Sequence, residues 1–415
     1  MSELKSTGKP FDISKGEVWE AYLKVKANQG AAGVDGCTIE EFEKDLRGNL
    51  YKIWNRMSSG SYFPPPVKGV GIPKSHGGEV RLLGVPTVSD RIAQTVVAKH
   101  LEKRVEPLFH AYSFGYRPGR SALDAVSACR ERCWKKKWVI DLDIAKFFDS
   151  VRWDLVMKAV ESHTDAAWVI LYVKRWLAAP VLMPNGTLQQ RDCGTPQGSA
   201  VSPILANLFL HYAFDMWLTR TFPGVQFERY ADDAVIHCSS ERQAREVLVQ
   251  LEGRMAEVGL QLHPDKTRIV YCGRERRRDD TATSFTFLGF TFRNRPAQDR
   301  HGKVFTSFLP AVSKDALKKM STEVRSWRIH MHVTYSFGEF AKWLNPIIRG
   351  WMQYYGAFYQ TELYPLLQRI NFYLLRWVRK KHKRLKTYKK ASRRWDQVVK
   401  SYPSFFAHWK WVNVT

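Results

Sequence analysis

The chain has 415 residues, 44% of them hydrophobic, which is enough for two or three domains with apolar cores. Lysine and arginine outnumber aspartate and glutamate by 65 to 40, and the net charge of +25 indicates a polyanionic partner, most simply nucleic acid. The apolar run at residues 166–173 is too short to cross a membrane, and the first thirty residues lack a signal-peptide core, so a cytoplasmic protein without membrane contacts is expected.

The cysteines show no zinc-binding pattern. Cys129 and Cys133 are spaced as neighbours on one face of a predicted helix, but no Cys-x-x-Cys pair or nearby histidine pair completes a tetrahedral site. We expect all six thiols to be reduced, and mostly buried or neutral.

The first elements are a helix predicted from Lys15 to Ala27, a glycine-rich loop at residues 28–36, and a proline- and glycine-rich segment with short β-like runs from Tyr62 to Pro86. In that segment Lys74 and Arg81 flank a turn, which predicts a hairpin. Two cations on such a hairpin suit an incoming triphosphate, although surface charge is the plain alternative in a chain with 65 basic residues.

Helices are predicted at 90–105 and 122–134, and a strand with alternating polarity follows them. The alternation in Trp138-Val139-Ile140-Asp141-Leu142-Asp143 puts two carboxylates on one face and the apolar side chains on the other. This strand therefore brings acidic groups to a surface that a neighbouring strand can share.

Two further helices are predicted at 153–177 and 203–218, and the adjacent acids Asp232 and Asp233 follow between two short β-like runs. A regular strand would send these neighbours to opposite faces, so both can serve one site only at or beside the tight turn of a hairpin. A solvated Asp-Asp turn is equally compatible with these residues alone. Carboxylates that converge from two strands suit Mg²⁺, and two such ions promote phosphoryl transfer.

After a helix predicted at 241–258, a hairpin is predicted from strands at 285–293 and 304–309. From about residue 309 the chain changes to helices rich in aromatic and basic residues. The stretch Arg376–Arg394 holds eleven lysines or arginines in nineteen residues and no acid, with Trp377 and Tyr388 between them. Because a solvated face normally mixes both signs of charge, this composition favours a surface that tracks phosphates.

The order of short motifs resembles that of reverse transcriptases encoded by group II introns. The two acidic motifs are Asp143-Ile144-Ala145-Lys146-Phe147-Phe148-Asp149 and Tyr230-Ala231-Asp232-Asp233, and five supporting blocks occur in the family's order. These blocks are Ile72-Pro73-Lys74 with Arg81, Ser113 to Arg120, Gly194-Thr195-Pro196-Gln197-Gly198, Pro264-Asp265-Lys266-Thr267, and Phe287-Leu288-Gly289-Phe290. Each block is weak alone, but seven in order make coincidence negligible.

The resemblance implies an α/β right-hand polymerase fold, with fingers and an antiparallel palm sheet, followed by an α-helical thumb and maturase domain. The expected divisions are an N-terminal extension at 1–60, fingers and palm at 61–308, and the helical domain with its basic segment at 309–415. In the family, the loop at 28–36 resembles a lid over the template and primer.

The resemblance also assigns the site residues. It makes Asp143, Asp232 and Asp233 the catalytic carboxylates, which together with Ile144 would hold two Mg²⁺ ions. It places four nucleotide contacts, at Lys74, Arg81, Phe148 and Gln197. Phe148, five residues after Asp143, matches an aromatic that excludes the ribose 2′-hydroxyl; a core role is the alternative.

The implied activity is RNA-directed DNA synthesis from dNTPs on an RNA template with a DNA primer. The implied partners include the group II intron RNA, whose splicing and mobility the protein would assist, and a DNA target. Because no segment is expected to hold an HNH nuclease, the chain looks most like the short, class C type. The alternatives are a retron, diversity-generating or phage-defence reverse transcriptase, which the block at 345–356 argues against, and a splicing chaperone without polymerase activity.

Overall fold

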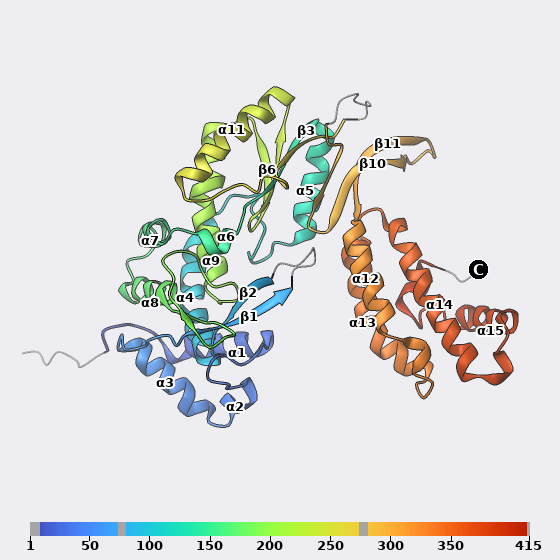
Figure 1. Cartoon of the computed structure of the whole chain (residues 1–415), viewed down its shortest axis with the longest axis horizontal. Coiled ribbons are helices and arrows are strands. Elements are labelled where there is room, and N and C mark those ends of the chain that lie inside the picture. Colours follow the sequence, from blue (N-terminus) through green and yellow to red (C-terminus); the bar gives the residue numbers. More distant parts are fainter. Residues whose placement is uncertain (1–8, 74–79, 274–280, 413–415) are drawn as a thin grey trace, which may run out of the picture. The chain divides into compact units, whose positions relative to one another are not determined.

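The computed structural model describes residues 9–73, 80–273 and 281–412 (Figure 1). The chain forms two compact units. The first comprises Met1–Ser121, Leu142–Ala234 and Arg245–Thr267, and the second comprises Ala122–Asp141, Val235–Ala244 and Arg268–Thr415. The expected division at residues 60 and 308 stays a prediction. Among the described residues, no helix has both the length and the apolar character needed to cross a bilayer.

Most of the regular secondary structure of the first unit is helical. Its helices are α1 (Lys15–Asn28), α2 (Ile39–Glu43), α3 (Leu46–Ser58), α4 (Val88–Val105), α6 (Phe147–Ser150), α7 (Trp153–Glu161), α8 (Ala167–Ala178), α9 (Ser202–Leu210), α10 (Met216–Thr221) and most of α11 (Glu241–Glu257). Side-chain caps fix several of their starts. Ser14 and Glu17 form a capping box at α1, and the Thr87 hydroxyl accepts the Asp90 amide at α4, which satisfies N–H groups that a helix start leaves free.

Two of the predicted helices differ from the structure. The helix predicted at 153–177 is wrong as a single element, because the chain breaks between α7 and α8, where the Thr164 hydroxyl accepts the Ala166 amide. The helix predicted at 203–218 is interrupted by a π-helical segment, His211–Asp215, between α9 and α10. Such a segment fits an extra residue into a helix and changes the direction of the side chains that follow it.

The hairpin predicted between residues 62 and 86 is confirmed. Strands β1 (Val67–Pro73) and β2 (Val80–Val85) pair antiparallel, from Lys68 opposite Val85 to Pro73 opposite Val80. They belong to the sheet β2-β1-β4-β5, which is completed by β4 (Val181–Leu182) and β5 (Leu188–Gln189).

A second sheet has the order β6-β7-β3-β8. Its strands are β6 (Gln226–Tyr230), β7 (Asp233–Cys238), β3 (Trp138–Asp143) and β8 (Arg268–Tyr271). Strands β3 and β8 pair antiparallel, with Trp138 opposite Tyr271 and Asp141 opposite Arg268. The structure thus confirms a strand at each of the two predicted acidic motifs, and it makes β7 the neighbour of β3.

The second unit contains α5 (Ala122–Lys135) and a sheet of three strands, β9 (Ser284–Phe287), β10 (Phe290–Gln298) and β11 (Val304–Val312), in the order β11-β10-β9. The single strand predicted at 285–293 is therefore wrong, because the chain reverses at Leu288-Gly289. Both residues have a positive φ, 51° and 80°, and so form a tight turn.

After β11 the second unit is helical, as the sequence predicts. Its helices are α12 (Lys314–Ser326), α13 (Phe337–Tyr355), α14 (Tyr364–Lys381) and α15 (Tyr388–Ser401), coloured orange to red in Figure 1. Most of their aromatic residues pack in one core, where the rings of Trp327 and Trp351 stack with centroids 5.5 Å apart. Trp377 belongs to this core and is 1% exposed, although it lies within the basic stretch Arg376–Arg394.

Candidate active site

The two adjacent acids lie at a turn between strands. Strand β6 ends at Tyr230 and β7 begins at Asp233, which leaves Ala231 and Asp232 as the link. Ala231 has φ of 58°, in the left-handed region that an alanine rarely adopts. This conformation breaks the alternation of a regular strand. The structure therefore has the turn that Asp232 and Asp233 need if both are to serve one site.

Gly115 packs directly against this turn. A Cβ atom on Gly115 would lie 2.4 Å from the Ala231 nitrogen and 3.0 Å from the Tyr230 carbonyl carbon. Backbone hydrogen bonds align the two segments, from Phe114 N to Arg229 O at 2.8 Å and from Arg229 N to Tyr112 O at 2.9 Å. Only glycine allows this approach, which explains the glycine in the block Ser113 to Arg120.

The third acid, Asp143, is the last residue of β3. Its Oδ2 atom lies 3.0 Å from the Lys266 ammonium, and its carbonyl accepts the His263 amide at 2.8 Å. The next residue, Ile144, is buried and forms an isolated bridge with Leu262. The block Pro264 to Thr267 thus lies beside Asp143, and its lysine supplies positive charge to a carboxylate that is 37% exposed.

The carboxylates of Asp143 and Asp232 interact electrostatically. Burial raises the pKa of Asp232, and the charge of Asp143 raises it further, whereas Arg81 and Arg229 act in the opposite direction. Two carboxylates that repel each other in a partly buried site are a suitable donor set for a hard divalent cation, which would favour their ionised forms. Asp233 begins the next strand and is partly buried.

The predicted nucleotide contacts Arg81 and Gln197 meet in the structure. Arg81 Nε donates to Gln197 Oε1, and the Gln197 carbonyl accepts the Gly84 amide at 2.7 Å. The turn that carries Gln197 is therefore anchored on β2. Lys74 lies outside the described residues.

A buried polar cluster also holds the turn that carries Gln197. Gln94 Oε1 accepts the Ser199 hydroxyl at 2.6 Å and the Ala200 amide at 2.7 Å, and Gln94 Nε2 donates to Asp90 Oδ2 at 2.8 Å. Burial raises the pKa of Asp90 to about 6, although hydrogen bonds from Trp176, Tyr62 and Gln94 oppose the shift. The cluster ties α4 to the nucleotide turn.

Phe148 lies in α6 and is 6% exposed, with its ring 5.2 Å from that of Phe147. Its carbonyl accepts the Thr195 amide at 2.7 Å, so its backbone is joined to the same turn as Gln197. This position next to the nucleotide turn is compatible with both interpretations, a sugar contact and a core residue.

Three residues around the acidic turn were not expected from the sequence. Arg229 pairs with Asp215, and Asn207 contacts Arg229, all three buried. One signal was present, because an arginine within an apolar strand and an aspartate within an apolar helix each require a buried partner. The sequence does not say that they are each other's partners.

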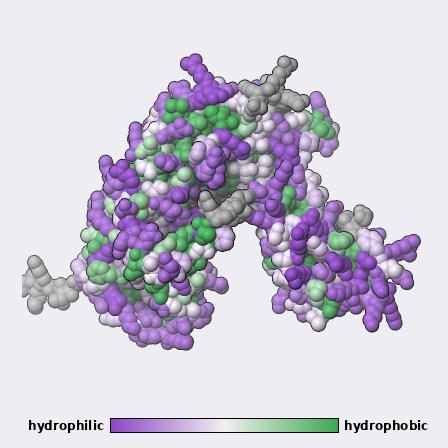
Figure 2. Space-filling model, viewed as in Figure 1, coloured by the Kyte–Doolittle hydropathy of each residue, from purple (hydrophilic) through white to green (hydrophobic). Residues whose placement is uncertain are grey.

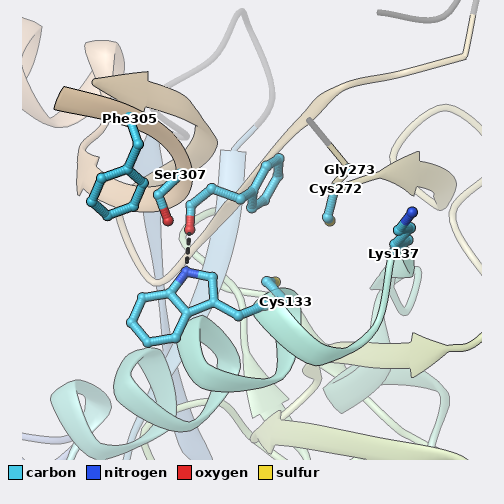
Figure 3. Close-up of a pocket in the computed structure, with 8 residues that line it drawn as sticks. Cys133, Lys137, Cys272, Gly273, Phe305 and Ser307 are labelled. Atoms are coloured by element: carbon cyan, nitrogen blue, oxygen red, sulfur yellow. Dashed lines mark hydrogen bonds between the residues drawn. The ribbon is translucent and has the colours of Figure 1, made fainter. Parts of the chain in front are cut away.

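The second unit has a pocket of about 540 Å³ that is distinct in composition from the carboxylate site. In Figure 3, Phe305 and Ser307 of β11 line it together with Cys133 of α5, Lys137, Cys272 and Gly273. Trp134 Nε1 donates to the Phe308 carbonyl at 3.0 Å across its floor. No carboxylate is among the described residues that line this pocket, and those residues do not offer the oxygen ligands that Mg²⁺ requires.

The thiols beside this pocket form a cluster with a histidine. All six cysteines are free, and the buried Cys133 thiol hydrogen-bonds with Cys129, Cys272 and His237. The sequence spacing did not reveal that His237 and Cys272 join the pair in α5. Sulfur and imidazole ligands suit zinc better than magnesium, so the cluster does not compete with the carboxylates as a Mg²⁺ site.

The eleven basic residues of Arg376–Arg394 lie at the end of α14, in the connection to α15, and in α15 itself. Ten of them are exposed, and none pairs with a carboxylate in the described part of the chain. Lys381 is the partly buried one and donates to the Tyr335 carbonyl. Figure 2 shows mostly hydrophilic residues over α15, which agrees with a surface for a polyanion.

This combination of sheet, turn and carboxylates is that of a palm-type polymerase. Residues 72–292 match the family described as Reverse transcriptase (RNA-dependent DNA polymerase), and residues 317–395 match the Group II intron, maturase-specific domain. The first match covers more than half of the chain, which therefore belongs to the reverse transcriptase family. The second makes the chain a reverse transcriptase with a maturase domain, homologous to proteins of group II introns.

Several individual proteins are similar to this chain. Protein YkfC of Escherichia coli K12 is 31% identical over 283 residues, 58% of this chain and 72% of that protein. The group II intron-encoded protein LtrA of Lactococcus lactis is 30% identical over 193 residues, 46% of this chain and 32% of that protein, so the match spans about a third of LtrA. A telomerase structure from Candida albicans aligns with 91% of this chain and 69% of its own, at 12% identity and a TM-score of 0.48.

Proposed function

We propose that the protein is an RNA-directed DNA polymerase in which Asp143, Asp232 and Asp233 hold two Mg²⁺ ions. The observation that supports this most directly is that Asp143 ends β3, while Asp232 and Asp233 lie immediately before and at the start of the neighbouring strand β7. The Ile144 carbonyl is the remaining proposed ligand. When bound, the ions would activate the primer 3′-hydroxyl and stabilise the leaving oxygen during transfer to a dNTP α-phosphate.

The chain's own residues then bind and orient the nucleotide. Arg81, exposed and next to Gln197, presents a guanidinium to the triphosphate, with Lys74 as the second proposed cation. Gln197 lies on a turn that hydrogen bonds to Gly84 and Gln94 hold in place, so the backbone position from which its side chain extends is fixed. Phe148 is the proposed wall against the ribose 2′-hydroxyl.

Lys266 has a role that follows from its contact with Asp143. Its ammonium lies 3.0 Å from Oδ2 and is exposed, so it balances this carboxylate without being enclosed. With a divalent cation bound, Asp143 would share the same oxygen between the ion and Lys266. Lys266 would then be available to another anion, such as a phosphate of the nucleotide.

The helical domain is the proposed binding surface for structured RNA. The match to the maturase-specific domain and the unpaired charges of Arg376–Arg394 support binding of a group II intron RNA, with assistance to its splicing and mobility. The partners proposed for the whole cycle are this RNA, an RNA template with a DNA primer, dNTPs and a DNA target.

Replacement of Asp233 by Asn tests the polymerase function. It removes one charged metal ligand with little change in shape, so Mg²⁺-dependent primer extension should be lost while affinity for a structured RNA stays within a few fold. Asp149→Asn is the matched control, because Asp149 is an exposed carboxylate six residues after Asp143 and outside the proposed ligand set. Retained extension by Asp233→Asn would contradict the assignment of Asp233 as a metal ligand. A wild-type protein without Mg²⁺-dependent extension would leave the chaperone function as the better one.

A further inference from the structure

A buried ion pair lies directly behind the acidic turn. Arg229 is 1% exposed and Asp215 is fully buried. Their side chains meet at two points, with Nε to Oδ1 at 2.7 Å and Nη2 to Oδ2 at 2.6 Å. This parallel arrangement fixes the plane of the guanidinium as well as its position.

The same guanidinium reaches the acidic turn. Arg229 Nη1 donates to the Ala231 carbonyl at 3.1 Å and to Asn207 Oδ1 at 3.0 Å. Ala231 is the residue with the strained left-handed conformation, and its carbonyl precedes the amide of Asp232. The ion pair therefore acts on the peptide that separates Ala231 from the first of the two acids.

Asn207 extends the contact to the other side of the turn. Its Nδ2 donates to the Gly115 carbonyl at 2.7 Å, and Gly115 packs against the Ala231 nitrogen. The side chains of Arg229 and Asn207 thus hold both the turn and the segment that presses on it. All of these residues belong to the first unit.

The local structure of the helix places Asp215 for this role. It is the last residue of the π-helical segment His211–Asp215, which follows the helix that carries Asn207. The segment brings Asn207 and Asp215, eight residues apart, to the same guanidinium. Helical segments of this kind have less favourable hydrogen-bond geometry than an α-helix, and they are frequent at functional sites.

Stability alone does not account for this arrangement. Desolvating an arginine and an aspartate costs several kcal/mol, and well-packed apolar residues in place of such a pair are often neutral or stabilising. A strained backbone residue persists only where its surroundings determine its conformation. The residues that determine the conformation of Ala231 are the Arg229–Asp215 pair and Asn207.

We propose that Arg229, Asp215 and Asn207 form a positioning network that holds Ala231 in its left-handed conformation, so that Asp232 and Asp233 face one metal site. The inference rests on the proposed polymerase function. None of the three residues belongs to the proposed metal ligands or nucleotide contacts. They act through the backbone of the turn, and the charge of Arg229 also lowers the pKa of Asp232.

The test is Arg229→Lys, which keeps the charge but cannot make the parallel contacts or reach the Ala231 carbonyl in the same geometry. The expected result is a folded protein with metal affinity and maximal extension rate each reduced about 10- to 100-fold, the range found when partners behind metal ligands are removed. Mn²⁺ binding by electron paramagnetic resonance measures affinity without turnover. The KM for dNTP should change less than about twofold, since the nucleotide turn is untouched.

Arg175→Lys is the matched control. Arg175 also donates to two backbone carbonyls of the first unit, Gly60 at 2.8 Å and Tyr62 at 2.6 Å, but these lie in neither the acidic turn nor the nucleotide turn. If Arg229→Lys binds Mn²⁺ like the wild type, or loses no more than Arg175→Lys at equal melting temperature, the network is only structural and the proposal is refuted.

A second variant decides the matter if Arg229→Lys does not fold. Asn207→Ala leaves the ion pair intact and removes the link to Gly115, so it should weaken Mn²⁺ binding and maximal rate in the same direction by a smaller factor. Wild-type Mn²⁺ affinity in this variant would overturn the proposal. Primer extension by the wild type tests the function separately, because its absence in the presence of Mg²⁺ refutes the polymerase function whatever the Arg229 variant does.

Discussion

The basic surface makes a quantitative prediction about salt. Of the eleven basic residues in Arg376–Arg394, Lys381 donates to a backbone carbonyl and Arg379 Nε donates to the Lys386 carbonyl at 3.0 Å. Exposed side chains without such contacts are better candidates for phosphate binding. Four of these, in the connection to α15 and in its first turn, are Lys383, Arg384, Lys389 and Lys390.

Changing these four residues together to Gln should reduce the salt dependence of RNA binding. Each phosphate contact contributes roughly 0.7 to 0.9 to the slope of log K against log salt, so four contacts contribute about 3. Between 50 and 200 mM salt, the wild type should then lose about 60-fold more affinity than the variant. Gln is chosen because it keeps the length and helix propensity of the side chains.

The assay is fluorescence anisotropy of a labelled RNA stem-loop at several salt concentrations. The control carries Lys158, Lys174, Arg220 and Arg242 changed to Gln, four exposed bases on α7, α8, α10 and α11. Both variants lower the net charge from +25 to +21 (25 − 4), so a general charge effect would act on both alike. An unchanged slope in the first variant, or an equal fall in the control, would refute the assignment of this surface.

Two further predictions concern the first unit. Phe148→Ala should raise incorporation of ribonucleotides relative to deoxyribonucleotides in primer extension, since a steric wall acts on discrimination; an unchanged ratio in a folded variant would make Phe148 a core residue. The pKa of Asp90 is raised to about 6 in the folded state. Between about pH 4 and 6 the folded protein therefore binds more protons than the unfolded chain. Because of this difference, the free energy of unfolding falls as pH rises through that window. From pH 5 to 7 this amounts to about 1 kcal/mol, which Asp90→Asn should abolish in denaturant titrations; an identical pH dependence in that variant would show that Asp90 does not titrate there.

The sequence predicted the acidic strand and hairpin because local rules determine them. Alternation over Trp138–Asp143 gives a strand with one acidic face, and two adjacent acids can share a site only at a turn. The structure confirms both elements and brings Asp143 and Asp232 within electrostatic reach. Arg81 and Gln197, 116 residues apart, were each assigned to the nucleotide through the resemblance alone, and no local pattern predicts their hydrogen bond.

The sequence-based predictions are wrong where a single residue determines the local backbone conformation or its burial. The break between α7 and α8 contains no glycine or proline; its signal is Thr164, whose hydroxyl accepts the Ala166 amide just before α8 begins. The turn at Leu288-Gly289 lies in an apolar run that reads as one strand unless the glycine is given a positive φ. Trp377 could not be assigned to the core because its basic neighbours dominate the composition of that segment.

The π-helical segment His211–Asp215 has a consequence for how such enzymes diverge. Successive residues of an α-helix are rotated by about 100°, so deletion of one residue that restored regular helix would turn Asp215 away from Arg229. Arg229 would then be buried without a counter-charge, which costs far more than losing both residues together. Among homologues, the extra helical residue, the aspartate and the arginine should therefore be inherited or lost as one unit, and a chain that keeps the arginine alone should be rare.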